Sequence, residues 1–229
     1  MKAVWRFALN MWEFLVDATP ARQRQHWGDI DFDCDYRVNT TSAGQGFLTR
    51  LRAALAGTPY QPSEPELFHQ MLGTLNIDHQ QFTFVDIGSG KGRALLMAAD
   101  YPFRRIIGVE LLPELHAIAA ENIRRYRGPR QRCFIIESRC SDACDFIFSQ
   151  TPLVVYLFNP LPPHKLRTVI ANLDRSVAEC ARETYLLYHH PEHEHVLAQF
   201  PQLSKIAATH QYVLYAWRKL DDNPTDIIA

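Results

Sequence analysis

The protein has 229 residues, of which 47% are hydrophobic and 21% charged, and its formal net charge at pH 7 is −1. This composition is typical of a folded globular chain, and the charge gives no overall field that would attract a polyanion. Five cysteines without a CxxC pair favour buried free thiols in a reducing compartment over a disulfide framework or a zinc site. No apolar run approaches the ~20 residues of a membrane span, and no signal peptide is recognisable, so we expect a cytoplasmic protein without a membrane span.

The first 60 residues are expected to be an extension of the main domain that serves as a lid or a packing segment. Residues 3–18 carry apolar side chains, several of them aromatic, at helical spacing. We expect this helix to pack on the main domain or on a second copy of the chain in a homodimer, with a membrane-surface helix as the alternative. The acidic stretch DIDFDCDY (29–36) lacks the glycine and the terminal glutamate of an EF-hand loop, so calcium is not expected there.

Further along, Ser63 and Glu66 have the spacing of a capping box, which predicts a helix start. From residue 82 onward, apolar runs alternate with helical patterns. The runs predict strands at 82–87, 105–110, 132–137, 152–158 and 184–188, and the patterns between them predict helices at 91–100, 113–126 and 163–181. Continuous apolar runs indicate a parallel sheet buried on both faces. Two strand-like runs within residues 203–220 predict a final hairpin.

The segment FVDIGSGKGR (84–93) ends the first predicted strand with an acidic residue and three alternate glycines. Glycine there permits a positive φ and lets a ligand approach the backbone closely. The segment lacks the Gly-Lys-Ser/Thr ending of a P-loop, and Arg93 stands where a dinucleotide-binding motif has its last glycine. A tight turn without any ligand is the remaining alternative.

Two more acidic residues follow predicted strands. Glu110 ends the second strand, where a carboxylate can accept hydrogen bonds from two ribose hydroxyls. Asp142 follows the third strand, where it can accept from an exocyclic amine. Together with Asp86, these acids favour a ligand that carries positive charge and no phosphate. S-adenosylmethionine (SAM) is such a ligand.

The segments FVDIGSGKGR, IIGVEL, SDACDF and VYLFNPLPP together resemble the successive motifs of class I SAM-dependent methyltransferases, over about residues 60–220. The resemblance implies an α/β, Rossmann-like, seven-stranded and mostly parallel sheet with an antiparallel C-terminal strand, helices on both faces and an N-terminal helical extension. Residues 1–60 would be the extension and residues 61–229 the SAM-binding domain. The implied cofactor is SAM, and no metal is expected. The implied cofactor-binding residues are Asp86, Gly88, Ser89, Gly90, Gly92, Glu110, Leu111, Asp142, Ala143 and Asn159.

The dipeptide Asn159-Pro160 resembles the Asn/Asp-Pro-Pro-aromatic motif of N-methyltransferases that act on adenine, guanine or glutamine amides. In that motif, a side-chain oxygen and a backbone carbonyl hold the hydrogens of the target nitrogen. Here Leu161 and Pro162 stand in place of the second proline and the aromatic residue, so a flat acceptor loses its stacking partner. A turn that only ends the strand remains the alternative for this dipeptide.

The fifth predicted strand ends in YHHPEHEH (188–195). We expect Asn159, Pro160 and His189 to be catalytic, with His189, or else its neighbour His190, as a base for an ammonium acceptor. Surface histidines without a role, or a metal site, are the alternatives for this cluster.

The most basic run is RRYRGPRQR (124–132). It ends a helix that starts at the ligand edge, so we expect it at the opposite edge, where positive charge suits a helix C-terminus, rather than in a nucleic-acid contact. The sequence therefore predicts a SAM-dependent methyltransferase that N-methylates a protein side chain or a small-molecule amine, without a strong nucleic-acid signal. A DNA or RNA base N-methyltransferase and a catalytically silent SAM-binding protein are the alternatives.

Overall fold

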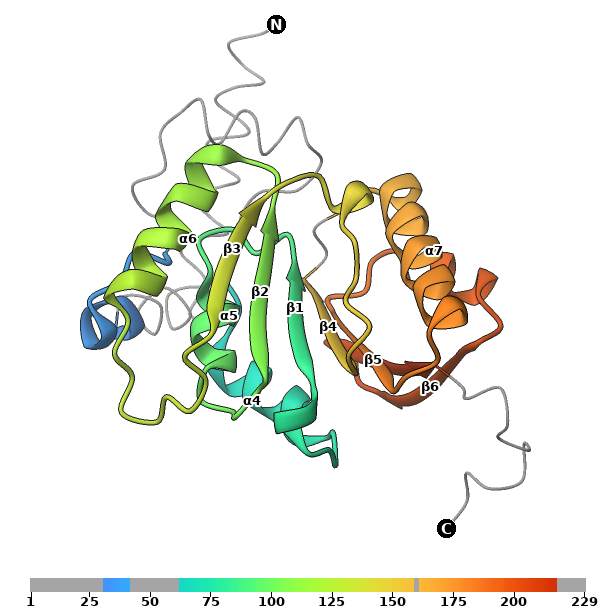
Figure 1. The fold of residues 1–229 in the computed structure, drawn as a ribbon, viewed down its shortest axis with the longest axis horizontal. Coiled ribbons are helices and arrows are strands. Elements are labelled where there is room, and N and C mark those ends of the chain that lie inside the picture. The colour runs from blue at the N-terminus through green and yellow to red at the C-terminus, as the bar shows by residue number, and fades with distance from the viewer. Residues whose placement is uncertain (1–30, 42–61, 159–160, 218–229) are drawn as a thin grey trace, which may run out of the picture.

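The computed structural model describes residues 31–41, 62–158 and 161–217. Its centre is a seven-stranded sheet in the order β3-β2-β1-β4-β5-β7-β6 (Figure 1). The strands are β1 Thr83–Ile87, β2 Arg105–Glu110, β3 Ile136–Cys140, β4 Leu153–Phe158, β5 Thr184–His189, β6 Leu203–Ala208 and β7 Tyr212–Trp217. Strands β1 to β5 are parallel, and β7 is antiparallel to both of its neighbours. The predicted sheet and its terminal hairpin are confirmed.

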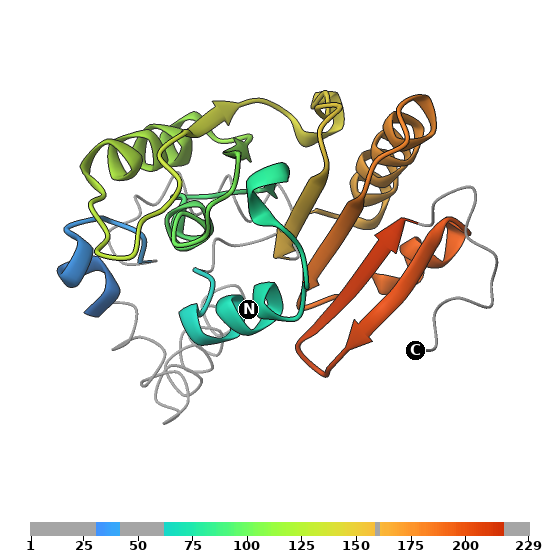
Figure 2. The same ribbon diagram turned by 60° about the horizontal axis from the view of Figure 1, so that its bottom comes forward.

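Helices cover both faces of this sheet (Figure 2). The α-helices are α4 Pro65–Gly73, α5 Arg93–Ala98, α6 Pro113–Arg125 and α7 Pro163–Glu179, and the short 3-10 helices are η1 His79–Gln81, η2 Ala143–Asp145 and η3 Glu194–Gln199. Helices α4, α6 and α7 each begin with proline, whose fixed φ suits the first helical turn. The side chains of α4 and α5 join one hydrophobic cluster, and those of α7 join a second cluster on the other face. The strands between the two clusters, β1, β2, β4, β5 and β7, are therefore buried along most of their length.

The third strand differs from its prediction. It spans 136–140 rather than 132–137, and its side chains are only partly buried or exposed. The reason is that β3 lies at the edge of the sheet, so it needs no continuous apolar run. The apolar signal came from Phe134 and Ile135, which precede the strand and are 76% and 57% exposed.

The predicted capping box at the start of α4 is wrong. The residue that precedes the helix is Glu64, and no side chain caps it. The Ser63 hydroxyl is instead 2.8 Å from the buried hydroxyl of Tyr156 on β4. A long-range hydrogen bond in the interior thus replaces the local bond that the sequence pattern predicts.

Much of the N-terminal extension lies outside the described residues. These undescribed parts include the predicted helix at 3–18, the homodimer through it and the domain boundary at residue 60, all of which stay predictions. Residues 31–41 are described, with helical backbone at 31–36. Their side chains Phe32, Tyr36 and Val38 pack against the cluster that contains α4 and α5.

The five cysteines are all free, as predicted, but only Cys133 is buried, and Cys34 and Cys140 are exposed. None of the described helices is long and apolar enough to cross a membrane. Across the described ranges, no group of three or more His, Cys, Asp or Glu side chains is arranged to hold a metal ion.

Gly108 in β2 should be intolerant of any side chain. A Cβ there would lie 2.6 Å from both Leu95 Cδ1 and Ser89 Oγ. We expect Gly108→Ala to lower the free energy of unfolding by about 1–3 kcal/mol, because overpacking strains a dense core. Urea unfolding measures this change in the free energy of unfolding. A matched control is Gly73→Ala at the end of α4, where a Cβ has no neighbour within 4 Å. Equal stability of the two variants would contradict the close packing at Gly108.

Candidate functional site

The predicted cofactor residues gather where β1, β2 and β3 end. Asp86 lies one position before the end of β1, Glu110 is the last residue of β2, and Asp142 precedes η2 just after β3. Because these strands are parallel and in register, their carboxyl ends share one edge of the sheet. In open α/β sheets, ligands bind beyond this edge.

The glycine turn, residues 88–92, connects β1 to α5 in left-handed backbone. The φ angles of Gly88, Gly90 and Gly92 are +78°, +55° and +85°, values that glycine adopts without strain. The amides of Gly88 and Ser89 donate to the Val109 carbonyl at 2.8 and 3.0 Å. The Gly90 amide donates to Glu110 Oε2 at 2.8 Å. Hydrogen bonds from three successive backbone amides thus fix the turn against the end of β2.

Glu110 and Asp86 form a pair of buried carboxyl groups beside this turn. They are 6% and 3% exposed. Burial raises the pKa of Glu110, and burial together with the charge of Glu110 raises the pKa of Asp86 well above its usual range. A cation bound near them would favour the ionised forms. The pair therefore suits a positively charged ligand.

Three further observations agree with an adenosyl ligand at this edge. The Ser89 hydroxyl is buried, and no hydrogen-bond partner for it exists among the described residues. Leu111, directly after β2, is an apolar side chain that remains 45% exposed. Glu110 Oε1 accepts from the Leu112 amide at 2.8 Å, and each carboxylate oxygen can accept a second bond, for example from a ribose hydroxyl. These residues fit SAM.

Asp142, the predicted adenine contact, has other partners in the structure. Its Oδ2 is 2.7 Å from Lys165 Nζ on α7, and its Oδ1 accepts from the Cys144 amide at 2.9 Å. The hydrogen bond from Lys165 holds the pKa of Asp142 below its usual value. The neighbouring Ala143 is buried in the core on the α7 side. Asp142 is therefore an ionised acceptor with spare lone pairs, fixed at the end of β3.

The predicted acceptor site is only partly described. Asn159 and Pro160 lie outside the described residues, so their catalytic roles stay predictions. Phe158, the last residue of β4, is stacked on His189 of β5 with ring centroids 4.0 Å apart and planes at 15°. The ring of His190 is also nearly parallel to both. Three planar rings therefore lie together at the carboxyl ends of β4 and β5.

His189 ends a buried chain of hydrogen bonds. Its Nδ1 is 2.8 Å from the Tyr156 hydroxyl, which is also 2.8 Å from the Ser63 hydroxyl. His189 is 1% exposed, and its Nε2 is buried without a hydrogen-bond partner in the described part of the chain. Burial, reinforced by the charge of His190, lowers its pKa to about 3. A histidine with so low a pKa is a weak base near neutral pH, so it acts as a neutral hydrogen-bonding group.

Among known proteins, only solved structures resemble this chain, and they resemble it in fold. No protein-family model matches the sequence, and no curated protein matches it. Among solved structures, an RNA methyltransferase from Salinibacter ruber in complex with S-adenosyl-L-homocysteine has a TM-score of 0.52 and 20% identity, over 73% of this chain and 99% of that one. A predicted N6-adenine-specific DNA methylase from Listeria monocytogenes also has a TM-score of 0.52, with 15% identity. The match covers 71% of this chain and 53% of that one.

The protein has the methyltransferase fold. At these identities the likeness concerns the fold alone, and the observed sheet with its antiparallel β7 is the one that the sequence resemblance implied. Both solved structures are described as nucleic-acid methyltransferases. The expectation of no strong nucleic-acid signal therefore finds no support in these likenesses.

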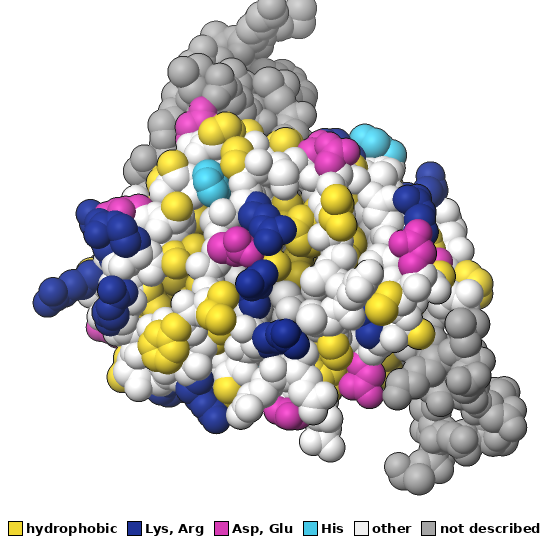
Figure 3. Space-filling view, in the orientation of Figure 1, with side chains coloured by type: hydrophobic (Ala, Val, Ile, Leu, Met, Phe, Trp, Pro, Cys, Tyr) yellow, Lys and Arg dark blue, Asp and Glu magenta, His cyan; other side chains and the backbone are white. Residues whose placement is uncertain are grey.

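The methyltransferase fold puts the basic run at the edge away from the glycine turn. The Arg132 amide donates to the Ala99 carbonyl at the far end of α5. Arg124 is paired with Glu121, and Arg139 on β3 with Glu137. In Figure 3, basic side chains on this face accordingly lie beside acidic ones at several places. The run does not form an unbroken positive patch there.

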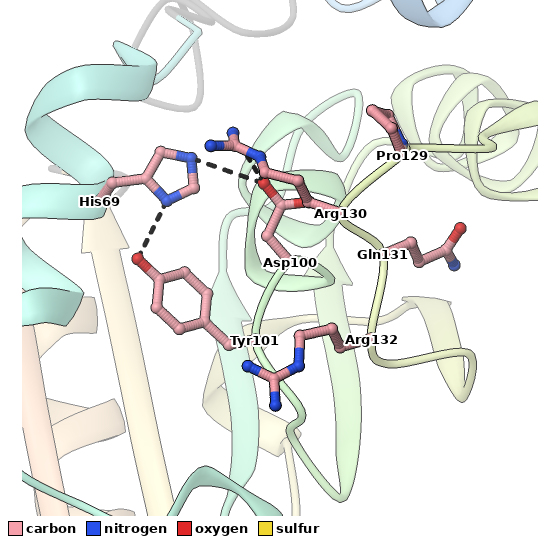
Figure 4. Close-up of a pocket in the computed structure, with 7 residues that line it drawn as sticks. All are labelled: His69, Asp100, Tyr101, Pro129, Arg130, Gln131 and Arg132. Carbon is pink, nitrogen blue, oxygen red and sulfur yellow. Dashed lines mark hydrogen bonds and ion pairs between the residues drawn. The ribbon is translucent and has the colours of Figure 1, made fainter.

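A surface hollow of about 560 Å³ lies at the same far edge. His69 Nδ1 is 3.0 Å from the Tyr101 hydroxyl, and Arg130 forms an ion pair with Asp100 at 3.0 Å (Figure 4). The far end of α5 carries Asp100 and Tyr101, whereas the near end of α5 carries the glycine turn. The hollow is therefore separate from the cofactor edge, and its charged groups are largely paired.

Several residues of the site escaped sequence reasoning. Ser63 and Tyr156 meet across 93 positions, so no local pattern could connect them. Lys165 contacts Asp142 from another helix. Gly108 and Lys91 lie within the quoted motifs, but their contacts are with other segments of the chain. Gly108 packs against Ser89 and Leu95, and Lys91 donates to Thr41.

The burial of His189 predicts a pH-dependent stability. The unfolded chain binds a proton on His189 below about pH 6.5, the usual histidine value, whereas the folded chain leaves it neutral down to about pH 3. Its contribution to stability is therefore present above pH 6.5 and is lost as the pH falls. Between pH 7 and pH 5, we expect the wild type to lose about 2 kcal/mol of unfolding free energy relative to His189→Gln. Urea unfolding at several pH values measures this difference, and parallel curves for the two proteins would contradict it.

Proposed function

We propose that the protein is a SAM-dependent methyltransferase that methylates a nitrogen of an acceptor bound at the carboxyl ends of β4 and β5. The observation that carries the proposal is the pair of buried carboxyl groups, Asp86 and Glu110, beside a glycine turn in left-handed backbone. The carboxyl groups of such a site favour a cationic ligand, and its glycines let that ligand approach the protein backbone closely. The fold of the known methyltransferases supports it.

In this proposal each cofactor residue has a separate task. Asp86, Gly88 and Gly90 would line the methionine part, and Glu110 would accept from the ribose hydroxyls. Leu111, Asp142 and Ala143 would contact the adenine, with Ser89 and Gly92 completing the turn. When bound, SAM would supply an electrophilic methyl group on a sulfonium.

The residues at β4 and β5 would position the acceptor nitrogen. Methyl transfer is an in-line displacement, so the rate depends on alignment and distance. The Asn159 side-chain oxygen and the Pro160 carbonyl would hold the hydrogens of the nitrogen, and His189 would contribute a neutral hydrogen bond through Nε2. An ammonium acceptor would have to lose its proton to water, because His189 is too weak a base. A protein side chain or a small-molecule amine fits these requirements.

A second candidate is N-methylation of a nucleic-acid base. The near-parallel rings of Phe158, His189 and His190 favour it, because His190 is exposed and a planar base could stack on such a surface. The fold likeness to an RNA methyltransferase and a DNA methylase agrees with it. A third candidate, a catalytically silent SAM-binding protein, differs only in lacking turnover.

The cofactor part is tested by Glu110→Gln. Replacing the carboxylate with an amide removes the charged acceptor, and a hydrogen bond to a charged group contributes about 1.5–3 kcal/mol. We therefore expect S-adenosylhomocysteine, the product form of the cofactor, to bind roughly tenfold to a hundredfold more weakly. Calorimetric titration measures this affinity. The control is Glu179→Gln at the exposed end of α7, which should bind like the wild type. Undiminished binding by Glu110→Gln would remove Glu110 from the site.

The acceptor part is tested by Asn159→Ala. Screening with labelled methyl donor against protein, small-molecule, RNA and DNA pools first identifies the acceptor class. We then expect Asn159→Ala to lower turnover by about a hundredfold or more, because a misplaced acceptor loses alignment, while the affinity for S-adenosylhomocysteine stays unchanged. The matched control is Asn76→Ala, at an exposed position between α4 and η1. Full turnover in Asn159→Ala would refute its role, and a wild type that binds cofactor without any transfer would favour the silent protein.

A further inference from the structure

The N-terminal strap, residues 31–41, is folded around the carboxylate of Asp33. Asp33 Oδ2 accepts from the amides of Thr40 and Thr41 at 2.7 and 2.8 Å, and its Oδ1 accepts from the Thr40 hydroxyl at 2.5 Å. One acidic side chain thus joins the helical part of the strap to its last residues. Asp33, one of the acidic residues of the stretch 29–36, is therefore hydrogen-bonded to Thr40 and Thr41 of the same strap.

Two cations of the glycine motif hold this strap. Lys91 Nζ donates to Asn39 Oδ1 at 2.9 Å and to the Thr41 carbonyl at 2.6 Å. Arg93 Nε donates to the Thr40 hydroxyl at 2.7 Å. Lys91 and Arg93 are only 1% and 2% exposed, although their side chains are long and charged. Because buried charges need such partners, the strap offsets the cost of removing these two cations from water.

Arg93 also reaches the first part of the strap. Its guanidinium lies 3.6 Å from Asp33 Oδ1 and 4.9 Å from the centre of the Phe32 ring. Asn122 of α6 adds a bridge between the strap and the glycine turn. Its Nδ2 donates to the carbonyls of both Asn39 and Lys91 at 2.9 Å, and its Oδ1 accepts from the Asn39 amide at 2.8 Å.

We infer that the strap is a working part of the cofactor site, in which Asp33, Lys91 and Arg93 are positioning residues that fix the glycine turn from behind. Alternation along the motif explains the arrangement: glycines occupy 88, 90 and 92, where the backbone meets the ligand, and the cations occupy 91 and 93. Docking of the strap and binding of the cofactor would then be coupled, and the coupling would be reciprocal. This inference rests on the proposed function.

The competing explanation is that the strap only covers the core with Phe32, Tyr36 and Val38. In that case the polar contacts would be incidental, and loosening the strap would leave the glycine turn unchanged. The two explanations differ in the behaviour of the backbone amides at 88–93, which can be measured without any cofactor.

The first experiment is amide hydrogen exchange on the free protein. Asp33→Asn removes the charge and puts an amide group against the donors of Thr40 and Thr41. We expect exchange at residues 88–93 to become at least tenfold faster than in the wild type. The matched control is Asp35→Asn, an exposed residue of the same helical turn, which should exchange like the wild type. Unchanged exchange at 88–93 in Asp33→Asn would overturn the inference, whatever the cofactor does.

A second variant guards against general loss of structure. Asn39→Ala shortens an exposed side chain that accepts from Lys91, and it leaves the strap backbone intact. We expect faster exchange confined to the strap and to residues 88–93, with β4 and β5 protected as in the wild type. Faster exchange throughout the molecule in both variants would instead indicate plain packing and would contradict the inference.

The third measurement is calorimetric titration with S-adenosylhomocysteine. We expect roughly tenfold weaker binding by Asp33→Asn, unchanged binding by Asp35→Asn, and slower exchange of residues 31–41 in the wild type when the ligand is bound. Equal affinities without protection of the strap would overturn the coupling. No binding by the wild type would refute the proposed function instead, while the exchange results on the free protein would still decide whether the strap fixes the turn.

Discussion

The hydrogen bond from the Gly90 amide to the buried carboxylate of Glu110 ties the glycine turn to the end of β2, and the cofactor edge depends on it. Gly108 has no side chain, which lets Ser89 of the same turn lie directly against β2. Glu110 therefore has a role in the fold besides its proposed contact with the ligand. A substitution of Gly108 or of Glu110 would alter the position of the turn relative to Asp86.

The glycine turn also separates charges of opposite sign. The carboxyl groups of Asp86 and Glu110 lie at the carboxyl ends of β1 and β2, where the ligand is proposed to bind, and the cations Lys91 and Arg93 contact the strap. An arrangement of this kind keeps the ligand edge acidic without leaving the buried cations unpaired. The alternation of glycine with longer residues in the motif thus has two physical functions. One permits close approach of a ligand, and the other anchors a neighbouring segment.

At the other half of the edge, burial decides the chemistry of His189. Its sequence position suggested a base, yet burial, reinforced by the charge of His190, lowers its pKa and keeps it neutral. The Phe158 ring is stacked on the imidazole, and the Tyr156 hydroxyl lies 2.8 Å from its Nδ1. A neutral imidazole held by Tyr156 and Ser63 has one fixed orientation, which suits positioning of an acceptor rather than proton abstraction. The next residue, His190, has a φ of +46°, a left-handed conformation that a histidine adopts at some energetic cost.

The sequence alone determined the sheet, the places of most helices and the acidic residues at the strand ends. Each of these features follows from local rules: apolar runs for buried strands, glycines for the turn, and chain order for Asp86, Glu110 and Asp142. Local rules failed where a residue's environment came from elsewhere in the chain. Ser63 was expected to cap a helix but is bonded to Tyr156, and the apolar residues Phe134 and Ile135 precede an edge strand instead of forming it. Only the tertiary structure brought the strap to Lys91 and Arg93 and removed His189 from water, because burial and long-range contacts arise when the chain has folded and are not encoded in any short segment.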